Sequence, residues 1–267
     1  MSDVIYRQVG KDHYYRTWHK SEKNMFLLLH SGDGSIVTRD GSFPMSEGTL
    51  CFIGNEKYHY TFPEHAENYV RSKIFISSNE LSALMKILNI SAAFPKKFDS
   101  DQIHIAMLDA QNIQIAEQLF RRLDQISLNS NYYQAELYSA VFRLIVLLCE
   151  GDHTRAHTSV SGIQSAVNYI NEHISEDLTI EDICKSVYMS KYYFCRLFKE
   201  KTGMTVMKYI LQTRIMMAKE MLRSGNMPIA HISEACAFSS ISYFSRIFKS
   251  ETGMTPLQYK KKNSKQL

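Results

Sequence analysis

The sequence lacks any cysteine arrangement typical of a disulfide framework or a zinc site. Its five cysteines are odd in number, scattered, and show no C-x-x-C spacing. Paired spacings are the usual sign of such cross-links or metal sites. We therefore expect reduced thiols, as in a cytoplasmic protein. The five residues are Cys51, Cys149, Cys184, Cys195 and Cys236.

Long apolar stretches are also missing. No run of 18 apolar residues occurs, so we expect no transmembrane helix. The first residues, MSDVIYRQVGKDHYY, are polar and lack the apolar core of a signal peptide. With 267 residues, 45% of them hydrophobic, the chain is long enough for about two globular domains.

Charge is divided unevenly along the chain. Residues 160–267 hold 15 Lys and Arg against 9 Asp and Glu, whereas the preceding residues hold the other 16 basic and 18 acidic side chains. A basic half is typical of polyanion binding, although a solvated surface gives the same asymmetry.

The basic half contains an internal repeat. Residues 190–209 read SKYYFCRLFKEKTGMTVMKY, and residues 240–259 read SISYFSRIFKSETGMTPLQY, an offset of 50. Farther upstream, Ile180 and Ile183 recur as Ile229 and Ile232, an offset of 49. A repeat with a one-residue insertion indicates two copies of one supersecondary unit.

Each copy is predicted to contain a short helix, a tight turn and a longer helix. In the second copy Ser240 begins a helix with an apolar stripe, and Gly253 is expected to end it in a left-handed conformation. Thr255 and Pro256 are then expected to cap and open a further helix. This outline fits a helix-turn-helix, and equally a helical bundle with internal duplication.

Residues 162–262 resemble the DNA-binding domain of the AraC/XylS family of transcription regulators. The resemblance rests on the pattern S-x-x-Y-F-S-R-x-F-K-x-x-x-G-x-T-P-x-x-Y over residues 240–259. It implies a domain over 161–262 with helix-turn-helix motifs at 179–201 and 228–251. The family usually has Gly in each turn, where this chain has Tyr188 and Ala237. A positive φ at either position would cost about 1 kcal/mol.

The resemblance also implies which residues bind double-stranded DNA. Arg196 and Arg246 are the strongest candidates for guanine or phosphate, with a salt bridge to a neighbouring acid as the alternative. Lys199 and Lys249 are expected to reach phosphate. Between the motifs, a helix over 205–224 would span about 30 Å, close to the ~34 Å of one DNA turn. The full set is Lys191, Tyr192, Cys195, Arg196, Lys199, Ser240, Ile241, Ser242, Ser245, Arg246 and Lys249.

The first part of the chain is predicted to be rich in strands. Short apolar runs alternate with glycine turns, including a hairpin signal at residues 31–34. In front of an AraC-type domain, residues 1–90 resemble that family's cupin-like sensor barrel. The predicted fold class is α+β, with this barrel and its helices followed by an all-α domain of two helix-turn-helix units. The expected strands are 25–29, 35–39, 49–53, 58–62 and 69–76.

A sensor barrel needs polar groups that converge on a small-molecule effector. An aromatic face suits a sugar ring, and Arg with His supplies hydrogen bonds. The candidates are Arg16, Trp18, His30, Tyr58, His59 and Tyr60. A metal-dependent cupin enzyme is the competing interpretation, but no second histidine lies two residues beyond His19. We therefore expect no catalytic residues, no metal and no cofactor.

Residues 91–150 are predicted to be helical and to include a dimerisation element, followed by a polar linker at 151–160. One helix, over 110–126, carries an apolar stripe that packs inside the protein or against a second copy. The stripe consists of Ile113, Ala116, Leu119, Phe120 and Leu123. The sequence thus predicts a cytoplasmic, dimeric, effector-controlled DNA-binding regulator that meets RNA polymerase if it activates transcription. A helical adaptor that does not bind DNA is a further alternative.

Overall fold

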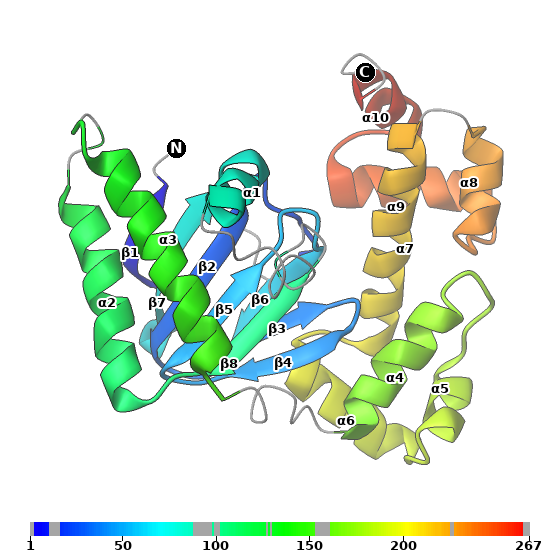
Figure 1. Ribbon diagram of the computed structural model, residues 1–267. Coiled ribbons are helices and arrows are strands. Elements are labelled where there is room, and N and C mark those ends of the chain that lie inside the picture. The colour runs from blue at the N-terminus through cyan, green and yellow to red at the C-terminus, as the bar shows by residue number, and fades with distance from the viewer. Residues whose placement is uncertain are drawn as a thin grey trace. The chain divides into compact units, whose positions relative to one another are not determined.

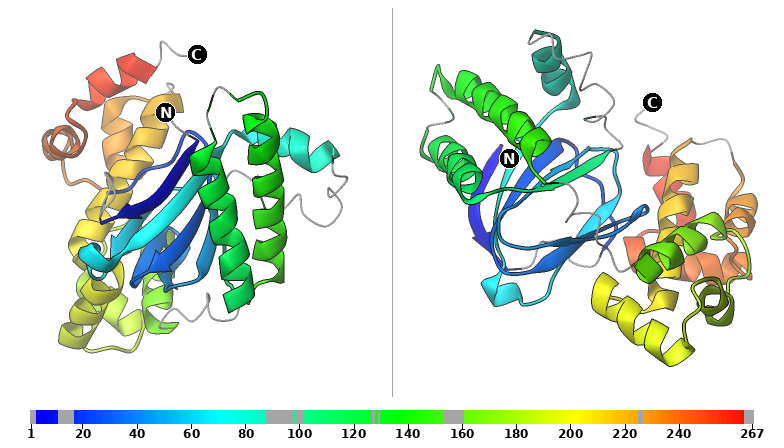
Figure 2. Two further views of the ribbon diagram at one scale, coloured as in Figure 1. Left: turned by 90° about the vertical axis from the view of Figure 1, so that its left-hand side faces the viewer. Right: turned by 60° about the horizontal axis from the view of Figure 1, so that its bottom comes forward.

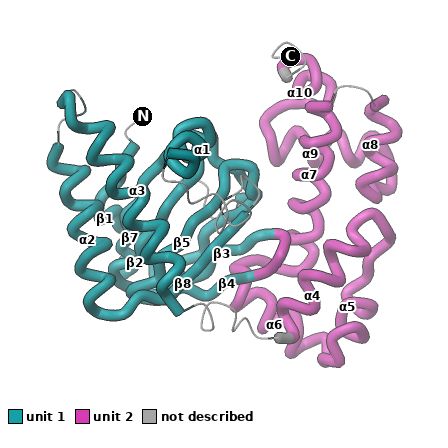
Figure 3. The backbone as a smooth tube through the Cα atoms, in the orientation of Figure 1, with its two compact units in different colours: residues 1–38, 42–159 teal, residues 39–41, 160–267 magenta. Residues whose placement is uncertain are grey.

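The computed structural model describes residues 3–10, 17–87, 98, 102–126, 128, 130–152, 161–224 and 227–263. The chain forms two compact units, shown in different colours in Figure 3. The first comprises Met1–Thr38 and Ser42–Ser159, and the second comprises Arg39–Gly41 and Val160–Leu267. The effector candidate Arg16 and residues 153–160 of the predicted linker lie outside the described residues.

The first unit contains two antiparallel sheets (Figure 1). The larger sheet has the order β1-β7-β2-β5-β8, and the smaller has the order β4-β3-β6. The predicted α+β class is confirmed. The strands are β1 (Val4–Val9), β2 (Asn24–Ser31), β3 (Gly34–Thr38), β4 (Gly41–Met45), β5 (Thr49–Ile53), β6 (His59–Pro63), β7 (Val70–Ile76) and β8 (Ile103–Met107).

The turn at residues 31–34 does not form the predicted hairpin. It carries the chain from β2 in the larger sheet to β3 in the smaller one. Gly32 takes a φ of +81°, which favours glycine, and a Cβ on Gly34 would lie 2.7 Å from the Phe62 carbonyl oxygen. Glycine is therefore needed here for a change of sheet and a close backbone approach.

Strand β8 corrects the expectation that residues 91–150 are helical throughout. It pairs antiparallel with β5, with Ile105 opposite Cys51, and so completes the edge of the larger sheet. Strands β1 and β4 were also absent from the sequence prediction. All three lie at the edges of their sheets, and tertiary pairing rather than a local pattern makes these segments strands.

The larger sheet buries both of its faces. On β2, Phe26 and Leu28 belong to the core shared with the helices, whereas Leu27 and Leu29 belong to the core between the sheets. Alternate residues of a strand point to opposite faces, which explains this division. The helices are α1 (Ser78–Ile87), α2 (Ala110–Gln125) and α3 (Tyr133–Glu150), with a short 3-10 turn at Ala66–Asn68. Figures 1 and 2 show α2 and α3 side by side against the sheet.

The stripe predicted for dimerisation is mostly committed to this core. Ala116, Phe120 and Leu123 are 0%, 0% and 2% exposed, and Ile113 and Leu119 pack partly buried against the same cluster. The amphipathic pattern of α2 was recognised correctly, but its partner is the sheet of its own unit. The outward side of α2 is polar, with Gln114, Gln118 and Arg121 exposed.

The second unit is all-helical. The two copies of the repeat end alike, because α6 and α9 stop at Gly203 and Gly253 with φ of 74° and 75°. The Thr255 and Pro256 start of α10 is confirmed, since Thr255 Oγ1 accepts from Gln258 N at 3.3 Å. The helices are α4 (Ser161–Glu172), α5 (Ile180–Ser186), α6 (Lys191–Thr202), α7 (Val206–Ser224), α8 (Ile229–Ala235), α9 (Ile241–Thr252) and α10 (Pro256–Asn263). Among the helices of both units that the structure describes, none is long and apolar enough to span a membrane.

His30, an effector candidate, lies on the helix-facing side of the larger sheet. Its position on β2 alternates with Leu29, and its Nε2 lies 2.6 Å from Ser72 Oγ. Burial, aided by the charge of Arg7, lowers the pKa of His30 from 6.5 to about 4. The imidazole is therefore a neutral packing element between sheet and helix.

We expect His30 to make the protein less stable in acid. Below pH 6.5 the unfolded chain binds a proton at this site that the folded chain refuses, so stability falls between pH 6.5 and about 4. In His30→Gln this contribution disappears, and the free energy of unfolding should decline less over that interval. Urea unfolding at pH 7 and pH 4.5 measures the difference. The exposed histidine variant His65→Gln is the control, and an identical decline in His30→Gln and wild type would contradict the assignment.

Candidate functional site

Helices α6 and α9 each present one exposed face that carries the predicted DNA-binding residues. Arg196 and Lys199 are exposed on α6, and Arg246 and Lys249 occupy the equivalent exposed places on α9. The opposite faces are buried through Phe194 and Phe198 in α6 and through Phe244 and Phe248 in α9. The remaining candidates, Lys191, Tyr192, Ser240, Ile241 and Ser242, are exposed, while Cys195 and Ser245 are half-buried.

The two arginines have the same surroundings. The guanidinium carbon of Arg196 lies 5.9 Å from the centroid of the Tyr193 ring, and that of Arg246 lies 5.6 Å from the Tyr243 ring. Within the described part of the chain, neither arginine is held by a carboxylate. The salt-bridge alternative is therefore not supported, and cation–π contact orients both side chains on the exposed faces.

The starts of the two helices differ. Lys191 Nζ lies 2.6 Å from Glu181 Oε1, and this hydrogen bond raises the pKa of Lys191 and lowers that of Glu181. The equivalent residue of α9 is Ile241, and α9 is instead capped by Ser240, whose Oγ accepts from Tyr243 N at 3.2 Å.

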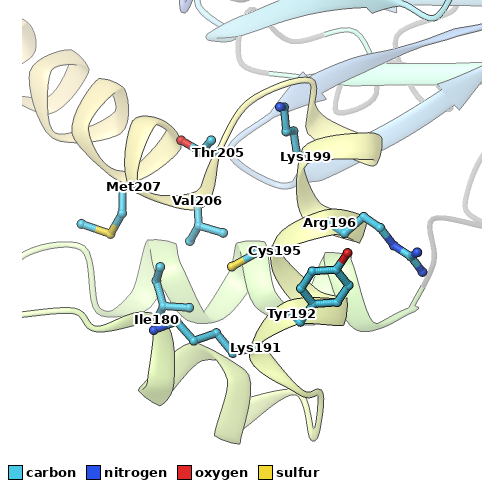
Figure 4. Close-up of a pocket in the computed structure, with 9 residues that line it drawn as sticks. All are labelled: Ile180, Lys191, Tyr192, Cys195, Arg196, Lys199, Thr205, Val206 and Met207. Atoms are coloured by element: carbon cyan, nitrogen blue, oxygen red, sulfur yellow. The ribbon is translucent and has the colours of Figure 1, made fainter.

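A groove of about 690 Å³ runs along the exposed face of α6 (Figure 4). Helix α6 contributes Cys195 to its wall, the start of α5 contributes Ile180, and the start of α7 contributes Val206 and Met207. The other lining residues are Lys191, Tyr192, Arg196, Lys199 and Thr205.

Both helix-turn-helix turns contain a non-glycine residue in the left-handed region. Tyr188 has a φ of 54° and Ala237 has a φ of 51°. Each conformation costs about 1 kcal/mol for an L-residue. The turns keep the geometry that glycine usually supplies, so the departure from the family pattern leaves the motif intact.

Arg214, in the middle of α7, connects the two helix-turn-helix units. Its Nε and Nη2 donate to the carbonyl oxygens of Ile174 and Glu176, at 3.1 and 2.6 Å, before the first motif. Its Nη1 donates to the carbonyl oxygen of Ala237, at 3.1 Å, in the turn of the second motif. One side chain thus fixes the segment before α5 and the strained turn before α9 to the same helix.

Helix α7 sets the separation of the two recognition helices. Its 19 residues span about 28 Å. Successive major-groove segments on one face of DNA are about 34 Å apart. A rigid helix of this length, clamped at its centre, can present α6 and α9 to neighbouring turns of one duplex.

The effector candidates of the first unit do not converge on one place. Tyr60 is opposite Val37, on the face away from Ile36 and the core between the sheets, and its ring lies 4.9 Å from Trp18. His59 is opposite Thr38 on the inner face, and its Nδ1 lies 2.9 Å from the Lys57 carbonyl oxygen. His30 faces the helices, and Tyr58 lies just before β6 with its ring 5.8 Å from Lys20 Nζ.

Two cationic residues of the inner face escaped the sequence analysis. Arg71 and Lys73 on β7 are opposite Leu29 and Leu27, so they share the face that looks toward the smaller sheet. They are 0% and 7% exposed. Their i, i+2 spacing in VRSKIFI placed both on one face and was the available signal. The eight described strands contain no Asp or Glu.

The chain is similar to several known proteins. A model of a helix-turn-helix domain matches residues 183–262. The transcriptional activator RhaR of Mannheimia succiniciproducens is 23% identical over 237 residues, which cover 86% of this chain and 83% of RhaR. An AraC-type DNA-binding domain from Chromobacterium violaceum is 30% identical and covers 39% of this chain and 93% of its own, with a TM-score of 0.37. ToxT from Vibrio cholerae is 15% identical and covers 96% of both chains, with a TM-score of 0.39.

The chain belongs to the AraC/XylS family of transcription regulators. It is a DNA-binding transcription regulator. The whole-length relatives are named as transcriptional activators, which disfavours the metal-dependent cupin alternative.

We expect Arg214→Met to destabilise the AraC-type domain. The change removes three hydrogen bonds from a charged donor and leaves the Ala237 carbonyl without this partner, at a cost of about 2 kcal/mol in the free energy of unfolding. Urea unfolding monitored by circular dichroism measures it. Arg223→Met, also on α7, is the matched control and should cost less. Equal stability of Arg214→Met and wild type would show that the clamp contributes nothing.

Proposed function

We propose that this regulator binds one face of a DNA duplex with α6 and α9 in successive major-groove segments. The observation that supports this most directly is the equivalent exposure of Arg196 on α6 and Arg246 on α9. Both helices pack against α7, the helix that carries Arg214. The basic balance of residues 160–267 adds the electrostatic attraction that phosphates require. The alternative of a helical adaptor does not account for two matched cationic faces separated by a helix about as long as one turn of DNA.

The proposed roles follow from side-chain chemistry. Arg196 and Arg246 donate two hydrogen bonds to the O6 and N7 of guanine, the commonest specific contact in the major groove. Lys199 and Lys249, farther along each helix, bind phosphate and position the protein. The other residues of the two exposed faces contact the remaining base edges.

Replacing either arginine by alanine should weaken specific binding by ~1–3 kcal/mol and relax the preference for one base pair. The expected effect is the same for Arg196→Ala and Arg246→Ala, because the two side chains occupy equivalent places. Electrophoretic mobility shifts measure it on a duplex that the wild-type protein selects from a random library.

The control is Lys185→Ala, which removes an exposed positive charge from α5 outside the two faces. It should leave the base preference unchanged. If both arginine variants keep the affinity and base preference of wild type, the assignment of the recognition helices is wrong.

We further propose that the effector binds on the inner face of the first unit's sheets, near His59, Thr61 and Arg71. Thr61 is opposite Ile36 of the core between the sheets, and so lies on the same inner face as His59. A guanidinium, a hydroxyl and an imidazole suit a ligand rich in oxygen atoms, such as a sugar or a small carboxylate. Trp18 lies on the other face of β6 and gives this proposal no stacking surface.

An effector of this kind should raise the melting temperature of the full chain, because it binds only the folded protein. A panel of sugars and small carboxylates is screened by thermal shift. Thr61→Val, which keeps the shape of the side chain, should reduce the shift, whereas Ser250→Ala in α9 should not. If the effector shifts the melting temperature of Thr61→Val as much as that of wild type, its binding site does not include Thr61.

Two further elements complete the proposal. We infer that the chain acts as a homodimer, through surface other than the buried stripe of α2, and sedimentation velocity with and without the effector tests this. A chain that stays monomeric at tens of micromolar would contradict it.

RhaR is named as an activator, so we infer contact with RNA polymerase in the cytoplasm, where the chromosome lies. Run-off transcription separates activation from repression.

A further inference from the structure

The two recognition helices share an arginine and a lysine but differ at two positions that precede the arginine. Helix α6 carries Tyr192 and Cys195, whereas α9 carries Ser242 and Ser245 at the same offset of 50 residues. Tyr192 is 81% exposed, and Cys195 and Ser245 are both half-buried. The same backbone position therefore offers an aromatic ring and a thiol in one unit and two hydroxyls in the other.

The surroundings of Cys195 make the difference larger. The groove beside it is walled by Ile180, Val206 and Met207, and the Met207 side chain is 51% exposed (Figure 4). Exposed apolar surface of this kind is favoured to become buried when a partner arrives.

The charge around the groove indicates what kind of partner covers it. Lys191, Arg196 and Lys199 border the same groove. A polyanion that carries an apolar group close to its hydrogen-bonding edge would match both features. In the major groove of DNA, thymine presents such a group, the C5 methyl, next to its O4 acceptor.

From this contrast we propose that the first helix-turn-helix unit selects thymine through contact of its C5 methyl group with Tyr192 and Cys195. The second helix-turn-helix unit recognises its half of the site through hydrogen bonds from Ser242 and Ser245. This inference rests on the proposed DNA-binding function and assigns a different chemistry of recognition to each half of the site. It makes Tyr192 and Cys195 residues that determine specificity.

The test removes single methyl groups from the DNA. Each thymidine of the library-selected duplex is replaced in turn by deoxyuridine, which lacks only the C5 methyl group. In the half of the site bound by the first helix-turn-helix unit, removal of each contacted methyl group should raise Kd about fourfold. In the half of the site bound by the second helix-turn-helix unit, the same replacement should leave Kd unchanged, because no methyl contact is proposed there. The half of the DNA site that loses its base preference in Arg196→Ala is the half bound by the first helix-turn-helix unit.

A matched exchange of side chains tests the assigned residues. The double variant Tyr192→Ser with Cys195→Ser copies the α9 residues into α6, and should lose the deoxyuridine effect while still binding DNA. The reciprocal variant, Ser242→Tyr with Ser245→Cys, changes side chains that are exposed or half-buried. It should acquire a methyl preference in the second half. Circular dichroism confirms that each variant folds.

The outcomes separate this inference from the proposed function. Failure of the wild-type chain to bind duplex DNA would end both. Specific binding with no deoxyuridine effect in the first half, or a selected first half without thymine, would overturn the methyl contact alone. An effect that persists unchanged in the Tyr192→Ser, Cys195→Ser variant would overturn the assignment to these two residues.

Discussion

The DNA-binding half of the structure depends on the three hydrogen bonds of Arg214. Both helix-turn-helix units also pack apolar side chains against α7, with Phe198 on Tyr209 in the first and Phe244 in a shared cluster in the second, and Arg214 adds polar links to each. Arg214 reaches backbone carbonyls before the first motif and in the turn of the second. Because backbone carbonyls are common to every residue type, this connection tolerates sequence change in the segments that it joins.

Internal duplication explains why both units have the same construction while their exposed faces differ. The left-handed glycine ends at Gly203 and Gly253 recur together with the buried phenylalanines, since both features determine the packing of each unit. The exposed positions are not constrained in this way. Tyr192 and Ser242 occupy equivalent places on closely similar helices, so the packing of the unit does not fix which residue stands there.

The sequence predicted the repeated half well, because its signals are local. The glycine ends and the Thr255 and Pro256 start depend on residues within one or two turns of each other. In the first unit the decisive contacts are distant in sequence. Strand β8 forms only because β5 offers an open edge, and the α2 stripe meets the sheet of its own unit. Which face of a strand carries Tyr60 or Arg71 likewise depended on the pairing register.

The ion pair between Lys191 and Glu181 changes how salt acts on this interface. A lysine that meets phosphate alone releases condensed cations from the DNA, and each released cation steepens the dependence of binding on salt. Lys191 already has a counter-charge 2.6 Å away. In the proposed complex, the first helix-turn-helix unit would therefore displace fewer cations than its number of basic residues suggests, and more of its affinity would persist as ionic strength rises.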